Sequence, residues 1–159
     1  MSEAARRIRV VPALIGTTVT VGVPVAVARL TPRVGSRPNA AVVALIGAEM
    51  LDGLLLTLSS ARRIYYDMDT PLGDRLPPRL LQDGVFAVRR NPMTVGVVRV
   101  LLGWAVLLGR PGVLAWSAFV LAGSATAIAY KEEPSLRRRF GTTYEEYCRG
   151  VRKWGWLGA

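Results

Sequence analysis

Two short polar clusters stand at the ends of a long apolar stretch, and together they could form one charged binding site. The first cluster, Arg89–Met93, contains two arginines and an asparagine. The second, Glu132–Tyr147, contains adjacent glutamates and two tyrosines. The stretch between them, Val95–Tyr130, has the length and composition of a membrane helical hairpin, so the chain should leave and re-enter one membrane face. The guanidinium and carboxylate groups are therefore expected to meet there.

A second set of ionisable residues lies within the apolar segments themselves. Glu49 and Asp52 are three residues apart inside Ala40–Ala61, so a helix would place them on one face. Carboxylates in hydrocarbon cost about 2.5–3.5 kcal/mol each on insertion scales, and by default indicate a site or a buried pair. Arg99, in the next apolar segment, is within reach if the two helices are adjacent. The three residues form either a structural ion pair or a substrate-binding site.

Several kinds of chemistry are excluded by residues that the sequence lacks. It has no histidine, which removes Ser-His-Asp catalysis and most zinc sites. Its single cysteine, Cys148, allows no intramolecular disulfide and no CxxC redox motif. Neither a GxGxxG nor a GxxxxGK motif is present, so no Rossmann domain or P-loop is expected. The aspartates between residues 67 and 83 stand among turn residues, and we predict no metal site.

The elements that must position these residues are helices. The chain is 51% hydrophobic and yet 20% charged, which means that its charge is segregated. We predict an all-α integral membrane protein with about four transmembrane helices. The predicted spans are Val10–Ala28, Ala40–Ala61, Val95–Leu108 and Gly112–Tyr130. The third span is short, and we expect a protein-lined environment for it.

The formal net charge of +10 would suggest nucleic acid as the partner of a soluble protein. Here, however, the arginines flank apolar spans, so we predict membrane lipids and no nucleic acid as partners. The positive-inside rule places both termini in the cytoplasm, in a protein of the cell inner membrane. The first apolar run is too long for a cleaved signal peptide and should be a permanent helix.

Residues 1–159 should form one domain. The segments outside the predicted membrane spans should cover its cytoplasmic end. Residues 1–61 would hold two transmembrane helices, 62–94 a loop rich in Pro, Gly and Asp, 95–130 the hairpin, and 131–159 interfacial amphipathic helices. Pro134 fits the first turn of a new helix and Gly141 should end it. Thr142 or Thr143 with Glu145 or Glu146 would then form a capping box.

The blocks of the two clusters resemble the isoprenylcysteine carboxyl methyltransferase and phospholipid methyltransferase family. The resemblance covers Thr70–Trp154, about half the chain. Its first blocks are Leu80-Leu81, Gly84, Phe86, Arg90-Asn91-Pro92-Met93 and Gly96; its later ones are Glu132-Glu133, Leu136, Phe140-Gly141 and Tyr144-x-x-Tyr147. Thr94 departs from the family pattern, which usually has tyrosine there.

This resemblance implies an enzyme that holds S-adenosylmethionine at the cytoplasmic membrane face without a Rossmann domain. It implies Arg90 and Glu133 as catalytic residues. The cofactor-binding residues that it implies are Leu81, Gly84, Phe86, Arg90, Asn91, Pro92, Glu132, Glu133, Tyr144 and Tyr147. Carboxylates suit the ammonium and sulfonium of that cofactor, arginine suits its carboxylate, and aromatic walls suit its adenine.

The expected acceptor is a lipophilic or lipid-anchored small molecule, bound near Glu49, Asp52 and Arg99. Carboxyl O-methylation is favoured because a carboxylate is already ionised and needs no general base in a protein without histidine. Methylation of a phospholipid amine is an alternative. So is a non-catalytic membrane module for binding or assembly. The oligomeric state is not predicted.

Overall fold

The computed structural model describes residues 13–67 and 78–155. A helix runs from Ala13 to Leu30 and includes the π-helical turn η1 (Thr18–Gly22) and α2 (Val23–Leu30). The later elements are α3 (Ala40–Ala61), η2 (Arg62–Asp67), α4 (Val85–Val88), α5 (Pro92–Leu108), α6 (Pro111–Ala127), η3 (Ile128–Glu132) and α7 (Glu133–Gly150). Within these described ranges no strand is present, and one isolated bridge joins Arg89 to Arg152. The predicted all-α fold class is confirmed.

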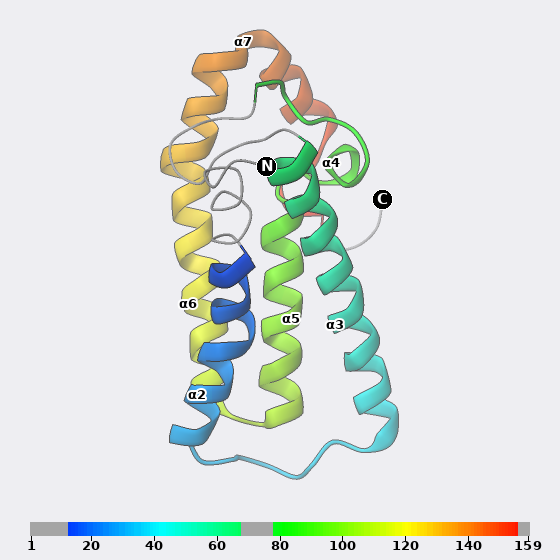
Figure 1. Ribbon diagram of the computed structural model, residues 1–159, viewed down its shortest axis with the longest axis vertical. Coiled ribbons are helices and arrows are strands. Elements are labelled where there is room, and N and C mark those ends of the chain that lie inside the picture. Colours follow the sequence, from blue (N-terminus) through cyan, green and yellow to red (C-terminus); the bar gives the residue numbers. More distant parts are fainter. Residues whose placement is uncertain (1–12, 68–77, 156–159) are drawn as a thin grey trace, which may run out of the picture.

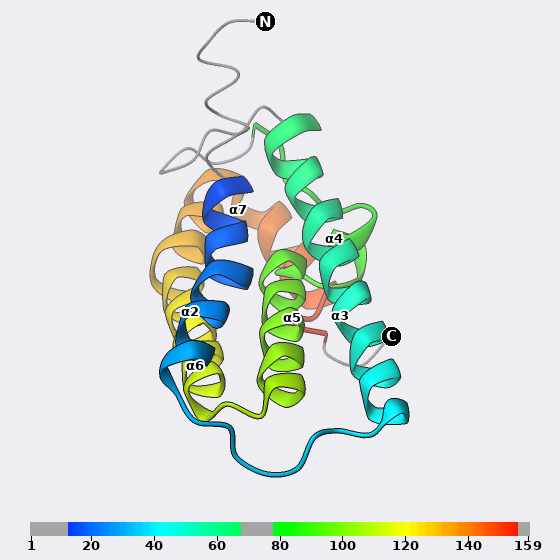
Figure 2. The same cartoon turned by 60° about the horizontal axis from the view of Figure 1, so that its bottom comes forward.

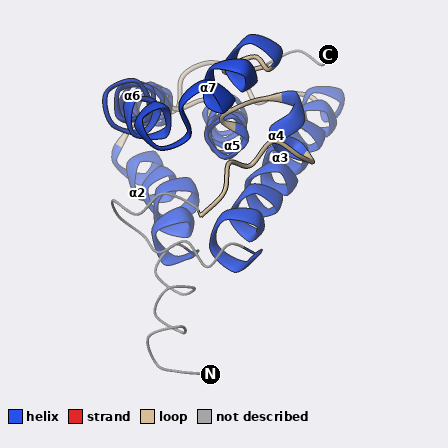
Figure 3. Ribbon diagram, turned by 90° about the horizontal axis from the view of Figure 1, so that it is seen from above, coloured by secondary structure: helices blue, strands red, loops and turns tan. Residues whose placement is uncertain are grey.

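The shortest of the apolar helices, α5, lies at the centre of the bundle (Figure 3). It contacts α3, α6 and α2 and buries Val95, Val98 and Leu101 almost completely. In the part of the chain that the structure describes, three helices are long and apolar enough to cross a membrane, and they cover Ala13–Leu30, Ala40–Tyr65 and Pro111–Gly150. This confirms the prediction that the third apolar span is short and lined by protein.

The outer helices expose large apolar side chains. Leu45 on α3 and Phe119 on α6 are 64% and 67% exposed. Water would make such surfaces costly, whereas lipid tails solvate them well. The chain is therefore an all-α membrane protein.

Glycines allow α3 and α5 to pack closely. A Cβ added at Gly53 would lie 2.8 Å from the carbonyl oxygen of Gly96 and 2.9 Å from Cβ of Arg99. A Cβ at Gly96 would in turn meet the backbone of Gly53 and Thr57. Small residues of this kind let two membrane helices approach backbone to backbone. This contact fixes the position of α5 and thus of the residues that precede it.

The segment expected as a loop, 62–94, is partly helical. Helix α3 continues into η2 as far as Asp67, and α4 forms a further short helix. Helix α5 begins at Pro92, before the predicted start at Val95, because proline is well suited to the first turn, where its missing N–H costs nothing. The central part of the predicted loop, 68–77, lies outside the described residues.

No separate helix begins at Pro134 as predicted, since α6, η3 and α7 form one helix, Pro111–Gly150. Pro134 would clash with the preceding turn of a regular α-helix. The wider η3 turn relieves this clash, and the N–H of Glu133 bonds to the carbonyl of Ile128, five residues earlier. The break predicted at Gly141 is confirmed, because this residue has φ 52° and ψ −127° inside α7.

The bundle has two distinct ends (Figures 1 and 2). At one end, the connection between α2 and α3 meets the turn between α5 and α6, where the N–H of Val34 donates to the carbonyl of Gly109 at 2.8 Å. At the other end, α4 and α7 lie over the start of α5 (Figure 1). Both polar clusters of the sequence are at this second end.

Candidate functional site

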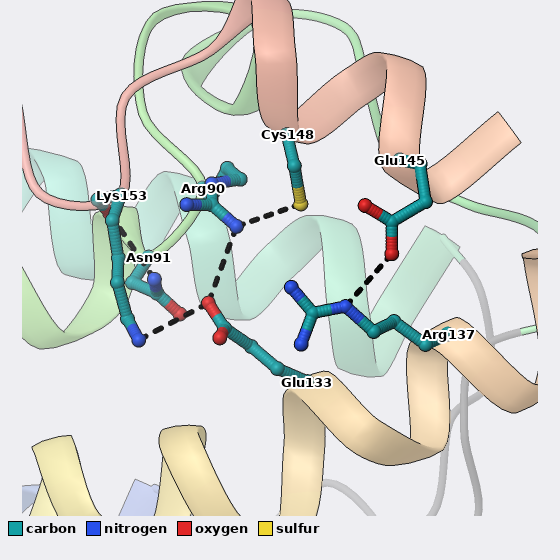
Figure 4. A network of polar contacts seen from close by, with 7 residues as sticks. All are labelled: Arg90, Asn91, Glu133, Arg137, Glu145, Cys148 and Lys153. Carbon is teal, nitrogen blue, oxygen red and sulfur yellow. Dashed lines mark hydrogen bonds and ion pairs between the residues drawn. The ribbon is translucent and has the colours of Figure 1, made fainter. Parts of the chain in front are cut away.

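The two polar clusters meet at the α7 end of the bundle, as the sequence predicts. Arg90 lies in the linker between α4 and α5, and Glu133 is the first residue of α7. The Arg90 guanidinium donates through Nη1 to Oε1 of Glu133 at 3.2 Å (Figure 4). Their side chains are only 14% and 12% exposed, so water screens this ion pair weakly.

Two further residues, which the sequence analysis did not assign to the site, complete the network (Figure 4). Nη1 of Arg90 also donates to Sγ of Cys148 at 2.8 Å. The ammonium of Lys153 lies 3.1 Å from the Glu133 oxygen that binds Arg90. Asn91 donates through Nδ2 to the carbonyl of Lys153 at 3.1 Å. The sequence showed Lys153 only as one more basic residue, and no spacing rule places it at Glu133.

The bend at Gly141 turns the second half of α7 back over the site. Tyr144 and Tyr147 are 2% and 8% exposed, with ring centroids 6.3 Å apart. The Tyr147 hydroxyl donates to the carbonyl of Phe86 at 2.6 Å and so links α7 to α4. Across the bend, Nε of Arg137 donates to Oε1 of Glu145 at 2.8 Å. The Glu145 carboxylate, predicted as a candidate for a capping box, thus takes part in an ion pair.

Both tyrosines are protonated at neutral pH, and burial raises the pKa of each still further above its ordinary value. Desolvation, with Cys148 adding to the effect, raises the pKa of Tyr144 to about 12. Desolvation likewise raises the pKa of Tyr147, although the positive charge of Arg90 opposes the rise. Protonated phenols donate hydrogen bonds and are poor general bases. Both side chains are therefore suited to donating hydrogen bonds and not to accepting a proton from a substrate.

The other residues that the sequence predicted for the cofactor site lie around this network. Leu81 and Phe86 are buried together, with Ile64 and Val85 packed against them. Gly84 has φ 58° and lies beside Arg63. Pro92 is buried in the first turn of α5, and Thr94, two residues later, is half-buried. Glu132 is exposed and lies outside the Arg90 network. The structure thus gathers most of the predicted residues but leaves Glu132 apart.

The residues predicted for substrate binding form a separate cluster within the helices. Nη1 of Arg99 donates to Oδ2 of Asp52, and its Nε lies 4.0 Å from Oε2 of Glu49. Both carboxylate side chains are more than half exposed. Because a helix rises 1.5 Å per residue, Arg99 is roughly 10 Å along α5 from Pro92. The expected ion pair exists, and it lies below the Arg90 network.

Two buried donors near the site have no partner in the part of the chain that the structure describes. They are Nε of Arg90 and Nη1 of Arg89. Leaving such a donor unpaired costs about 1–3 kcal/mol. An anionic group that entered the site would relieve this cost, while Glu133 offers a carboxylate for a cation. The arrangement suits a ligand that carries both charges.

The chain that carries this site is similar to a known protein family. No curated protein and no solved structure matches the chain. Residues 42–143 match the phospholipid methyltransferase family, a range that includes most of α3, all of α4 to α6, Arg90 and Glu133. Tyr144, Tyr147 and Lys153 follow the end of the matched range. Because the match covers more than half of the chain, this protein belongs to the phospholipid methyltransferase family, whose members are methyltransferases.

Proposed function

We propose that this protein transfers a methyl group from S-adenosylmethionine to a lipophilic or lipid-anchored acceptor at the membrane face where Arg90 and Glu133 meet. The observation that carries the proposal is this weakly exposed ion pair, which joins the two ends of a membrane helical hairpin in a chain of a methyltransferase family. When bound, the cofactor supplies a methyl group that its sulfonium already activates.

The residues present fit the amino-acid end of that cofactor. The unpaired Nε of Arg90 is a donor for its carboxylate, and Glu133 is an acceptor for its ammonium. Phe86, Tyr144 and Tyr147 supply the apolar and aromatic surface that an adenine requires. In the same proposal the surrounding positions Leu81, Gly84, Asn91 and Pro92 complete the walls, whereas Glu132 lies apart from the Arg90 network.

Positioning and exclusion of water provide most of the catalysis that such a reaction needs. Arg90 and Glu133 would act by orienting the donor, and the second half of α7, which buries Tyr144 and Tyr147, would keep water away. No general base is required if the acceptor is a carboxylate, because its reference pKa of about 3.5–4 leaves it ionised at neutral pH. This reasoning favours carboxyl O-methylation, since the chain has no histidine.

Methylation of a phospholipid amine is the second candidate. It is favoured by the description of the matched family. It is also favoured by Glu49 and Asp52, whose exposed carboxylates outnumber the one arginine between them and would attract an ammonium head group. For either acceptor, this cluster would lie near the head of the molecule that enters from the bilayer.

The orientation and the domain organisation are part of the same proposal. Among the described residues, basic side chains are concentrated at the α7 end, and those towards the other end are Arg29, Arg33, Arg37 and Arg110, which supports a cytoplasmic α7 end in a cell inner membrane. Residues 1–159 would form one methyltransferase domain in which residues 131–159 cover the cofactor.

Two measurements test the proposal. Calorimetry in detergent should detect binding of S-adenosylhomocysteine, and Glu133→Gln should weaken it strongly, whereas the matched variant Glu145→Gln should not. Transfer of labelled methyl groups should then be measured with vesicles that carry either a prenylated carboxylate or phosphatidylethanolamine. Absence of binding at millimolar ligand, together with absence of transfer, would contradict the enzymatic function.

The same assay examines the lipid-anchored acceptor. Each buried CH₂ contributes about 0.8 kcal/mol to recognition, so an acceptor without its chain should be a much poorer substrate. Equal turnover of the prenylated acceptor and its chain-free analogue would contradict entry from the bilayer.

A further inference from the structure

The last described residues, Val151–Gly155, form a C-terminal strap over the start of α5. The backbone N–H of Arg90 donates to the carbonyl of Arg152 at 3.0 Å, and the Asn91 amide donates to the carbonyl of Lys153 at 3.1 Å. Gly155 has φ +49° and lies so near Arg89 that an added Cβ would be 3.2 Å from the arginine Cβ. Backbone contacts therefore fix this strap, independently of its side-chain charges.

The strap brings an ammonium group to the carboxylate of the site. Lys153 Nζ and Arg90 Nη1 lie 3.1 and 3.2 Å from the same atom, Oε1 of Glu133. One carboxylate thus faces two cations (Figure 4). A third cation at this position would meet repulsion from both, because like charges at hydrogen-bonding distances disfavour one another.

The two cations are not held equally. Arg90 is 14% exposed and also donates to Cys148, whereas Lys153 is 27% exposed and carries its charge on a flexible four-carbon stem. An entering ammonium would therefore displace Lys153 more easily than Arg90.

We propose that Lys153 is a specificity residue that occupies Glu133 until the α-ammonium of the cofactor replaces it. This inference rests on the proposed function. It assigns a role to the strap, which lies outside the sequence blocks that resemble the family. The α-ammonium of a ligand takes the place of the Lys153 ammonium at Glu133, so the carboxylate loses one ionic contact and gains another. A ligand without an α-ammonium leaves Lys153 in place. Lys153 therefore lowers the affinity for ammonium-bearing ligands specifically.

Calorimetry in detergent with two ligands and three proteins tests this inference. The ligands are S-adenosylhomocysteine and its analogue in which hydrogen replaces the α-amino group; the proteins are the wild type, Lys153→Met and Lys153→Arg. Lys153→Met should bind S-adenosylhomocysteine about fivefold more tightly than the wild type, the scale of one partly exposed ion pair. It should bind the deaminated analogue with unchanged affinity. Lys153→Arg keeps a cation at Glu133 and should bind S-adenosylhomocysteine no more tightly than the wild type.

A second measurement uses the wild-type protein alone, so that it does not depend on how the variants fold. The chain has one other lysine, Lys131, whose exposed side chain is an internal reference. An amine-acetylating reagent should modify Lys153 faster, relative to Lys131, when S-adenosylhomocysteine is bound. The deaminated analogue should not change this ratio in mass spectra of the digested protein.

The outcomes separate the two proposals. If the wild type binds S-adenosylhomocysteine but Lys153→Met binds it equally or more weakly, the role of Lys153 is wrong and the proposed function stands. The role is also wrong if both ligands gain equally in Lys153→Met, or if bound S-adenosylhomocysteine leaves the acetylation ratio unchanged. If none of the three proteins binds either ligand, the proposed function fails, and the role of Lys153 fails with it.

Discussion

Arg90 and Glu133 are 43 residues apart in the sequence, and their side chains form an ion pair at 3.2 Å with 14% and 12% exposure. Removing one charge of such a pair leaves the other poorly solvated. For Glu133→Gln we expect a loss of about 2–3 kcal/mol in the free energy of unfolding, somewhat below the range for fully buried pairs. Unfolding in mixed detergent micelles measures this loss.

The control for this variant is Glu145→Gln. Glu145 pairs with Arg137 at a shorter distance of 2.8 Å, but both side chains are about half exposed, so the pair is screened by water. A much smaller loss is therefore expected. Equal losses in the two variants would contradict the view that burial, and not distance, determines the strength of the Arg90 pair.

Gly96→Ala should destabilise the bundle, because the added methyl group would meet the backbone of Gly53 and Thr57 on α3. Overpacking against backbone costs about 1–3 kcal/mol. Gly47→Ala is the matched control on α3, since an added Cβ there meets no atom within 4 Å. Thermal unfolding midpoints in detergent should fall for the first variant and stay unchanged for the second; the reverse order would refute the helix contact.

Gly141→Ala tests the bend in α7. An added Cβ meets no atom within 4 Å, but the backbone has φ 52° and ψ −127°, a region that residues other than glycine occupy at a cost of about 1–3 kcal/mol. We expect lower stability and weaker binding of S-adenosylhomocysteine, because a straighter α7 would move Tyr144 and Tyr147 away from Arg90.

The control for the bend is Gly150→Ala. Gly150 also has free space around its Cβ position, but it has no positive φ. This variant should unfold and bind ligand as the wild type does. If Gly141→Ala were equally harmless, the bend would not depend on glycine.

The proposed orientation predicts opposite accessibility for the two ends of the bundle. Cysteines should be introduced by Ser36→Cys, in the connection between α2 and α3, and by Ser135→Cys, in α7, each in a Cys148→Ser background. An impermeant maleimide should label the first in intact spheroplasts and the second only after permeabilisation. Labelling of both from one side would overturn the topology.

The sequence alone predicted the helices and the meeting of the two clusters. A long apolar segment in a membrane almost always forms a helix, because every backbone N–H and C=O group must find its hydrogen-bond partner within the segment. The two apolar segments between Arg90 and Glu133 are together long enough to bring the chain back to the membrane face that it left. The contact between these two residues therefore follows from the pattern of polar and apolar segments. The burial of α5 is also predictable, because its apolar segment is too short to cross the membrane alone and must be lined by protein.

Only the tertiary structure decided what completes the site. Lys153 reaches Glu133 because the strap pairs with the backbone of Arg90 and Asn91, and Cys148 reaches Arg90 because Gly141 bends α7. The continuity of α6 with α7 also escaped prediction, since a π-helical turn accommodated a proline that normally begins a helix. Such contacts join residues that are distant in sequence through backbone geometry, and neither residue type nor spacing encodes the direction in which a bent helix returns.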